Sequence, residues 1–383
     1  MRRVIMTASA LALGATAATA GGIERSGQSV GILFEQGNYV EFNIGRVRPD
    51  VSGTQQITAG QLSPAGVNSG DMAKDYTTMS LGLKMKVNDR IDAALIIDEP
   101  VGADVSYPIT GYLYGGSTAD INSYATTALL RYKFDNNISL IGGLRAVRTN
   151  GNVALFNGYT MSTDTQTDFG YVLGVAWEKP EIAARVALTY NSAITHDFNA
   201  HEVNLSPAAD VMTTFETEIP QSLTLEGQTG VAKDTLVFGS IRWVDWSAFQ
   251  IAPPIYMDSP ANVFKDPLVS YDNDSITYTL GVGRRFNENW SGAMFVSHET
   301  GKDGYAGNLG PTDGSTAVGL AATYTRDNLK ITGGVRYVMI GDAETETPAA
   351  LLAGNCPNGD CGTFGKFTDN HAVAIGLRIG YSF

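Results

Sequence analysis

The feature that most constrains this chain is an alternation of apolar and other side chains that recurs from residue 38 to the last residue. The segment 371–383 carries only apolar side chains on one face: Val373, Ile375, Leu377, Ile379, Tyr381 and Phe383. A period of two puts successive side chains on opposite faces of a β-strand. The segments 79–87 and 329–339 show the same period. The chain is therefore predicted to consist of strands with one apolar face each.

Tight and long connections alternate between these strands. Fourteen strands are predicted, at 38–47, 75–87, 90–100, 120–134, 138–150, 166–178, 181–200, 219–231, 234–246, 270–286, 290–299, 314–325, 329–341 and 369–383. The tight links, such as 88–89 and 135–137, carry the Asn, Asp and Pro residues typical of turns. Short turns on one side and long loops on the other are the pattern of an all-β transmembrane antiparallel β-barrel, whereas a soluble β-sandwich has no reason to sort its loops by length.

The start of the chain has the composition of a secretory signal. Two arginines precede an apolar run, and small residues end at Ala20, after which cleavage is predicted. Residues 1–20 are therefore interpreted as a signal peptide. The remaining sequence contains no run of 18 apolar residues, so a closed barrel is the structure by which it would cross a membrane.

Aromatic residues and the last residue favour the same interpretation. Aromatic side chains gather near the tight turns and again towards the far ends of the strands, as interfacial girdles do. The chain ends on Phe383, which resembles the signal read by the bacterial barrel-assembly machinery. We therefore expect that machinery as a partner during biogenesis, and the outer membrane as the location.

Composition and motifs exclude several functions. The formal net charge of −13 disfavours nucleic acid as a partner, because phosphates reward a basic surface. The two cysteines, Cys356 and Cys361, favour a local disulfide in an exported protein, and their loop lacks the further ligands of a metal site. The four histidines are scattered and no hydrolase motif is present. Neither an enzyme, nor a cofactor, nor a metal is expected.

Several segments resemble, in order and spacing, the FadL/TodX family of outer-membrane transporters for hydrophobic compounds. They are Val47–Gly53, Leu83–Tyr107, Phe134–Val147, Ala187–Ser192 with Asp197–Phe198, Ile219–Ser222 and Trp243–Phe249. The resemblance implies a barrel at 38–383, of about 14 strands, closed by an N-terminal hatch, for which residues 21–37 are available. It also implies passive uptake of long-chain fatty acids or other hydrophobic compounds by a monomer that contacts outer-membrane lipid and lipopolysaccharide.

In this family the cargo is thought to leave sideways through a kink in the third strand. Pro100 and Gly102 are the candidates for this kink here, because proline removes a donor from the ladder and glycine permits a bend. The alternatives are a general or substrate-specific diffusion porin and, less favoured, an outer-membrane barrel enzyme. The sequence leaves the identity of the cargo open.

Candidate ligand-binding residues follow from the predicted faces of the strands and from the hatch. The apolar candidates are Ile32, Leu33, Phe34, Leu129, Ile141, Leu236 and Phe238. Arg145 and Arg148 are the candidates for a contact with a carboxylate head group, since a guanidinium binds carboxylate bidentately. A lumen that is simply polar is the alternative explanation for these arginines.

Overall fold

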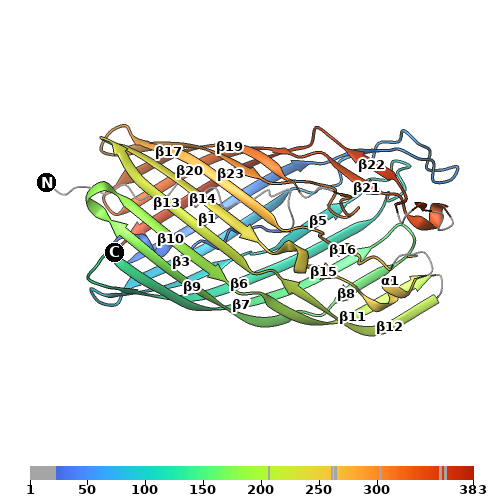
Figure 1. The fold of residues 1–383 in the computed structure, drawn as a ribbon, viewed down its shortest axis with the longest axis horizontal. Coiled ribbons are helices and arrows are strands. Elements are labelled where there is room, and N and C mark those ends of the chain that lie inside the picture. Colours follow the sequence, from blue (N-terminus) through green and yellow to red (C-terminus); the bar gives the residue numbers. More distant parts are fainter. Residues whose placement is uncertain are drawn as a thin grey trace.

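The computed structural model describes residues 23–205, 208–259, 262, 265–301, 304–352, 356–357 and 360–383. The predicted signal peptide lies outside the described residues. The described chain forms a closed antiparallel barrel of fourteen strands (Figure 1), which confirms the predicted fold.

Several wall strands are interrupted and are built from two labelled elements. In chain order the wall consists of β1 (Tyr39–Asp50), β3 (Tyr76–Lys86), β4 (Ile91–Asp98) with β5 (Gly102–Ser106), β6 (Thr118–Lys133), β7 (Ile138–Ala154), β8 (Thr160–Thr163) with β9 (Gln166–Lys179), β10 (Ala184–Asn191) with β11 (Ile194–Leu205), β12 (Ala208–Ile219) with β13 (Ser222–Ala232), β14 (Thr235–Val244), β17 (Ser275–Arg285), β18 (Trp290–Glu299), β19 (Ser315–Arg326), β20 (Leu329–Ile340) and β23 (His371–Ser382). The barrel closes because β23 pairs with β20 on one side and with β1 on the other.

The two ends of the barrel differ as predicted. The chain's C-terminus lies at the end with the tight turns, and the longer connections lie at the other end (Figure 1). The strands at the loop end are β2 (Gly53–Gln55), β15 (Gln250–Ile251), β16 (Val269–Ser270), β21 (Ala343–Glu346) and β22 (Thr363–Phe367). The helical segments are η2 (Gly31–Phe34), η3 (Pro180–Ile182), η4 (Trp246–Ala248), α1 (Pro254–Asp258) and η5 (Ala349–Leu352).

One predicted long loop is instead an extension of the wall. The connection expected between residues 200 and 219 is a hairpin of β11 and β12, paired out to Leu205↔Ala208. Its sequence continues the alternation, because Phe198, Ala200 and Glu202 are all buried on the inner face of β11. The strands therefore continue beyond the predicted span of the wall.

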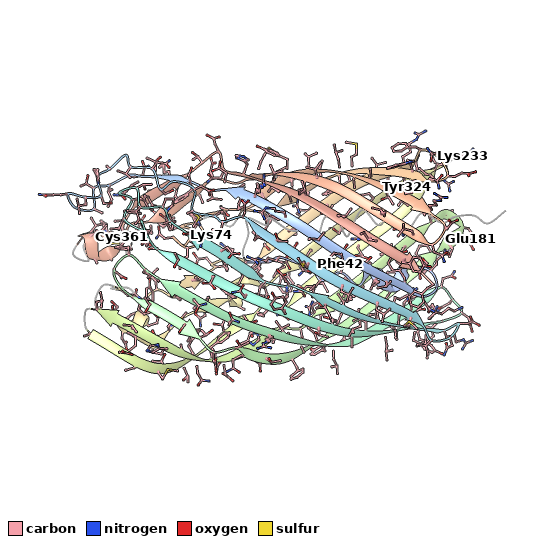
Figure 2. All side chains as sticks on the ribbon, turned by 180° about the vertical axis from the view of Figure 1, so that it is seen from behind. Phe42, Lys74, Glu181, Lys233, Tyr324 and Cys361 are labelled. Atoms are coloured by element: carbon pink, nitrogen blue, oxygen red, sulfur yellow. A yellow bond between two sulfur atoms is a disulfide. The ribbon has the colours of Figure 1, made fainter. Side chains whose placement is uncertain are left out.

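The wall has apolar side chains outside and polar ones inside. Large apolar residues such as Leu144, Phe169 and Leu280 are exposed on the outer face, whereas Arg131 and Arg242 are buried. Figure 2 shows Phe42 and Tyr324 on the wall, with Glu181 and Lys233 at the turn end and Lys74 and Cys361 at the loop end. This inverted arrangement suits a wall that is surrounded by lipid. Among the described residues, no helix is both long enough and apolar enough to span a membrane.

Candidate functional site

The described part of the hatch, residues 23–37, is fastened to inward-facing side chains of the wall. Glu24 forms an ion pair with Arg242 on β14, and Glu35 accepts hydrogen bonds from the Lys330 ammonium at 3.1 Å. Ser26 donates a hydrogen bond of 2.6 Å to the Asp98 carboxylate. Buried charges are tolerated when each has a partner of opposite charge or a hydrogen bond. The hatch and the wall supply these partners to each other.

An apolar cluster holds the hatch nearer the turn end. Ile32, Leu33 and Phe34 are buried in η2 and pack in one cluster with Leu129 and Ile141 of the wall. The Phe34 ring also lies 4.5 Å from the guanidinium carbon of Arg131 and 4.3 Å from that of Arg185. Cation–π contacts of this kind gain strength when they are shielded from water. The structure thus brings five of the predicted residues together as a contact between hatch and wall.

The two arginines predicted to meet a head group lie on opposite faces of β7. Arg145 is buried, donates a hydrogen bond of 3.1 Å to the Thr127 hydroxyl, and also contacts the Gln28 amide of the hatch. Arg148 is exposed between the buried Val147 and Thr149. It therefore faces away from the lumen, so the head-group contact predicted for Arg148 does not lie inside the barrel.

The two residues of β14 that were predicted to bind ligand face inward, but they pack against the neighbouring strand of the wall. Leu236 and Phe238 are both 2% exposed. A Cβ added at Gly281 on the neighbouring strand β17 would lie 2.3 Å from the Phe238 ring. The ring therefore packs over the bare backbone of that glycine, and none of the three cavities described below is lined by either residue.

The third wall strand is interrupted between β4 and β5, at the position of Pro100. Its register with β6 shifts by one residue there, from Asp98↔Ala125 to Gly102↔Asn122. On its other side, the ladder between β3 and β4 ends at Leu81↔Ile97. In the described chain, residues 76–80 of β3 have no strand pairing with the third strand. The wall is therefore open in its hydrogen-bond ladder at this point.

Backbone groups of the hatch form the hydrogen bonds with the third strand that β3 does not form. The Gly102 amide donates to the Ile23 carbonyl at 2.8 Å, and the Arg25 amide donates to the Pro100 carbonyl at 2.9 Å. The Arg25 guanidinium forms an ion pair with Asp104. A Cβ added at Gly102 would lie 2.4 Å from the Arg25 Nε atom. Glycine is thus needed here for the close approach of Arg25.

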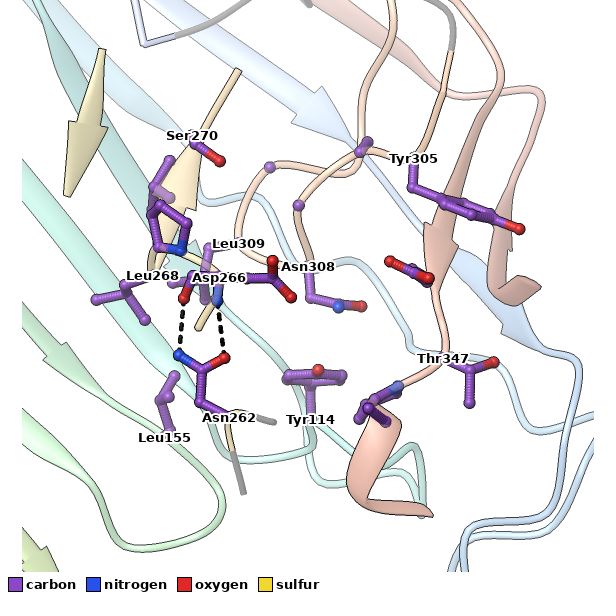
Figure 3. Close-up of a pocket in the computed structure, with 18 of the residues that line it drawn as sticks. Tyr114, Leu155, Asn262, Asp266, Leu268, Ser270, Tyr305, Asn308, Leu309 and Thr347 are labelled. Atoms are coloured by element: carbon purple, nitrogen blue, oxygen red, sulfur yellow. Dashed lines mark hydrogen bonds between the residues drawn. The ribbon is translucent and has the colours of Figure 1, made fainter. Parts of the chain in front are cut away.

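A large cavity opens among the loops at the outer end of the barrel. Its volume is about 700 Å³, and its lining includes Tyr114, Asn262, Leu268, Tyr305 and Leu309 (Figure 3). Asn262 donates to the Asp266 carbonyl at 2.8 Å and accepts from the Asp266 amide at 2.9 Å, which fixes the loop before Leu268. We call this cavity the vestibule.

Two smaller cavities lie deeper than the vestibule. One, of about 180 Å³, touches Gly102 and Asp104 of the interrupted third strand. The other, of about 60 Å³, is lined by Val101 and Phe198 among other residues. Leu268, Val269 and Leu309 line all three cavities. These loop residues therefore separate the vestibule from the two inner cavities.

Glu202 anchors the loop that carries Leu268. Its carboxylate is fully buried and accepts hydrogen bonds from the Tyr159 hydroxyl at 2.7 Å and the Thr213 hydroxyl at 2.5 Å. The amides of Ile255 and Tyr256 in α1 donate to the same carboxylate at 3.3 and 3.2 Å. Burial, together with the nearby carboxylate, raises the pKa of Tyr159 above its usual value. The anchor fixes the loop 245–274 to strand β11.

A hydroxyl, an imidazole and a carboxylate form one chain of contacts in the wall. Thr149 Oγ1 lies 3.1 Å from His196 Nε2, and His196 Nδ1 lies 2.7 Å from an Asp168 oxygen. This is the order found in hydrolytic triads, which also need free donors for an oxyanion. The nearby Gly151 amide already donates to Thr163 at 2.9 Å. The chain of contacts therefore lacks that neighbouring donor, and we give it no catalytic role.

The remaining predicted features lie in the loops. Cys356 and Cys361 are joined by a disulfide. Within the part of the chain that the structure describes, no group of three or more His, Cys, Asp or Glu side chains is arranged to hold a metal ion.

The closed barrel and the interrupted third strand define a β-barrel whose lumen is occupied by residues 23–37. Residues 31–383 match the family described as outer membrane protein transport protein (OMPP1/FadL/TodX). The chain belongs to this family of outer-membrane transporters for hydrophobic compounds. No curated protein sequence matches the chain.

Solved structures of similar fold are only distantly related in sequence. The crystal structure of a Pseudomonas aeruginosa FadL homologue has a TM-score of 0.73 at 15% identity and covers 92% of each chain. That of the Pseudomonas putida toluene transporter TodX has a TM-score of 0.61 at 11% identity and covers 95% of this chain and 97% of its own. The Ralstonia pickettii toluene transporter TbuX gives 0.57 at 12%, with 92% and 90% covered. At these identities the likeness shows the fold alone.

Proposed function

We propose that this protein takes up hydrophobic compounds passively, as a monomer, through a plugged barrel with a lateral exit. The cargo class is long-chain fatty acids or other apolar molecules such as aromatic hydrocarbons. The observation that carries the proposal is the fastening of the hatch to the interrupted third strand, beside an inner cavity that reaches the same interruption. The cargo would pass from the vestibule, past Leu268 and Leu309, to the opening beside Gly102.

A water-filled pore does not bind an apolar molecule, because each CH₂ group is stabilised, by about 0.8 kcal/mol, only when it leaves water. The structure supports a different route. The straight path along the lumen is obstructed by η2, whose residues Ile32, Leu33 and Phe34 are buried against the wall. The cavities above it are lined by side chains such as Val101, Phe198 and Leu268. An apolar lining of this kind binds apolar cargo by burial.

The lateral exit is also compatible with the hydrogen bonding of the backbone at the interrupted strand. Inside a membrane, an unpaired amide or carbonyl costs several kcal/mol. The hatch satisfies the Gly102 amide and the Pro100 carbonyl, so the third strand can remain unpaired from β3 without that cost. A hole in the wall is thereby stable while the hatch is docked. Escape into the membrane at this height also avoids the polar lipopolysaccharide layer.

Planar-bilayer conductance separates this proposal from a porin. The intact mature protein is expected to show almost no steady current, and deletion of residues 23–37 is expected to open it. A large ohmic current in the intact protein would support the diffusion porin instead.

Uptake by whole cells tests the cargo. A Gram-negative host without its own transporter of this kind should accumulate labelled oleate or labelled toluene faster when it produces the intact protein. Equal rates with and without the protein, for both compounds, would refute the proposed function.

A further inference from the structure

A second interruption of the wall lies between the sixth and seventh strands. β9 pairs with β10 as far as Val172↔Asn191, and β8 pairs with β11 from Thr163↔Ala200 onwards, in the same register. Between these two ladders, residues 165–170 have no register pair with residues 193–199, and all of these residues are described. We call this stretch the β9–β11 seam. Along this stretch the two strands are neighbours in the wall, but no strand ladder joins them.

One backbone hydrogen bond closes each end of the seam. The Ser192 amide donates to the Tyr171 carbonyl at 3.0 Å, and the Asp164 amide donates to the Asn199 carbonyl at 2.9 Å. The stretch without a ladder is therefore bounded by a backbone hydrogen bond at each end.

Side chains bridge the seam where the ladder is missing. Near its middle, His196 Nδ1 lies 2.7 Å from an Asp168 oxygen, and at one end the Asn199 side-chain amide donates to Asp164 at 2.7 Å. At the other end Ile194 lies over Gly170, where an added Cβ would be 2.7 Å from the Ile194 side chain. The two strands are thus joined by a few side-chain contacts, each of which can break independently, and not by a continuous series of backbone hydrogen bonds.

The 60 Å³ inner cavity reaches the β11 edge of the seam. Its lining includes His196 and Phe198 of the seam and, on another side, Val101 of the interrupted third strand. One lumen cavity therefore touches both interruptions of the wall. Its volume is far below the roughly 300 Å³ of a ligand-sized pocket, so a cargo must displace lining side chains to enter.

The outer face of the seam is aromatic on β9 and polar on β11, which is the mixture found where a barrel meets the headgroup region. Phe169 and Tyr171 are 75% and 47% exposed on β9, as residues of an aromatic girdle are. An opening at this level would connect the cavity with the headgroup region of the outer leaflet. Asp164 and Asp168 on one edge, and Asp197 within the other, give the seam an acidic character that disfavours a carboxylate.

We propose that the β9–β11 seam is a second lateral portal of this barrel, which passes uncharged hydrophobic compounds between the lumen cavity and the outer leaflet. The proposal rests on the proposed transport function and adds a route to it. The Asp168–His196 contact closes the portal, and its rupture lets the two strands part. Opening breaks this contact and the Asp164–Asn199 contact, whereas parting a regular ladder of the same length would break a series of backbone hydrogen bonds.

A removable cross-link across the seam tests the portal. In the double variant Asp168→Cys/His196→Cys, the two thiols replace groups that are in contact, and a short bis-maleimide can join them. The native cysteines are held in their disulfide and do not react with this reagent. Cells that produce the unlinked variant should take up labelled toluene at least as fast as the wild type. Linking should reduce toluene uptake more than twofold and leave oleate uptake unchanged.

Matched variants make each result decisive. The outward-facing pair Leu173→Cys/Tyr190→Cys joins the same strand to its neighbour within a regular ladder, so its cross-link should change neither uptake rate. The pair Asp164→Cys/Asn199→Cys at the end of the seam serves if the first variant does not assemble, as judged by heat-modifiable migration of the barrel. Its cross-link should have the same selective effect on toluene.

A link at the third strand separates failure of the portal from failure of the proposed function. The Met79 amide donates a hydrogen bond to the Glu99 carboxylate, so Met79→Cys/Glu99→Cys joins β3 to the interruption. If this link stops toluene uptake while the seam links do not change it, the portal is refuted and the transport function stands. If the intact protein gives no uptake above a host without it, the transport function itself fails.

Discussion

Replacement of Phe34 by alanine is expected to release the hatch. The side chain is 6% exposed and lies between the Arg131 and Arg185 guanidinium groups, so alanine removes apolar burial and two cation–π contacts together. Truncation of a buried phenylalanine costs about 3–5 kcal/mol. Since 1.4 kcal/mol corresponds to tenfold, a loss of about 4 kcal/mol raises the undocked-to-docked ratio of the hatch nearly thousandfold. The barrel itself should remain folded, because the strand ladders do not include this residue.

Single-channel recording measures that ratio as the fraction of time spent conducting. The wild type should be silent or nearly so, and Phe34→Ala should show frequent openings. Phe34→Leu keeps most of the apolar volume and loses only the ring contacts, worth about 1 kcal/mol each, so it should be intermediate. The control is Phe286→Ala at the same end of the barrel, where the ring is 66% exposed and outside the lumen. Equal, silent recordings from folded Phe34→Ala and Phe286→Ala would refute the reasoning.

Three further changes test other parts of the site. Gly102→Ala should displace the Arg25 guanidinium from the third strand and raise conductance, whereas Gly142→Ala, whose added Cβ would meet no atom within 4 Å, should not. Glu202→Gln weakens an anchor made of four hydrogen bonds, at about 1–3 kcal/mol, and should speed proteolysis of the loop 245–274 without changing the heat stability of the barrel. Hydrogen bonds from Thr363 and a nearby lysine lower the pKa of Glu344 below its ordinary 4.5. These bonds therefore stabilise the β21–β22 loop at any pH above 4.5, and the stabilisation is lost as the pH falls through the lowered pKa of the folded protein. Hydrogen exchange of this loop, measured between pH 6 and 3, should speed up accordingly.

Sequence periodicity predicts the wall well because each strand has its own apolar face. The positions of the tight turns, and the interruption at Pro100, follow from local residue chemistry in the same way. Arg148 shows where this reasoning is weakest. The sequence predicts a head-group contact for both Arg145 and Arg148, but three residues along a strand lead to the opposite face.

The residues that line the cavities could not be predicted in this way. Leu268 and Leu309 lie in loops, where no period relates a residue to a face, and their places depend on contacts with distant segments. Glu202 illustrates such a contact, since its partners in α1 are more than fifty residues away along the chain. The seam is equally invisible in the sequence, because residues 166–170 and 193–199 both lie inside strands that the sequence predicts. Only the structure shows that their ladder is missing.

The pairing of β1 with β23 also governs how the molecule can assemble. Tyr39 lies opposite Ser382, so the final ladder joins two strands from nearly opposite ends of the chain. Contacts of such sequence separation form late and slowly, since the entropy of closing the loop must be lost before they contribute. Until then both strands are open edges, ready to pair with another molecule. Refolding of this barrel should therefore be slow and sensitive to protein concentration, with aggregation competing until the first and last strands meet.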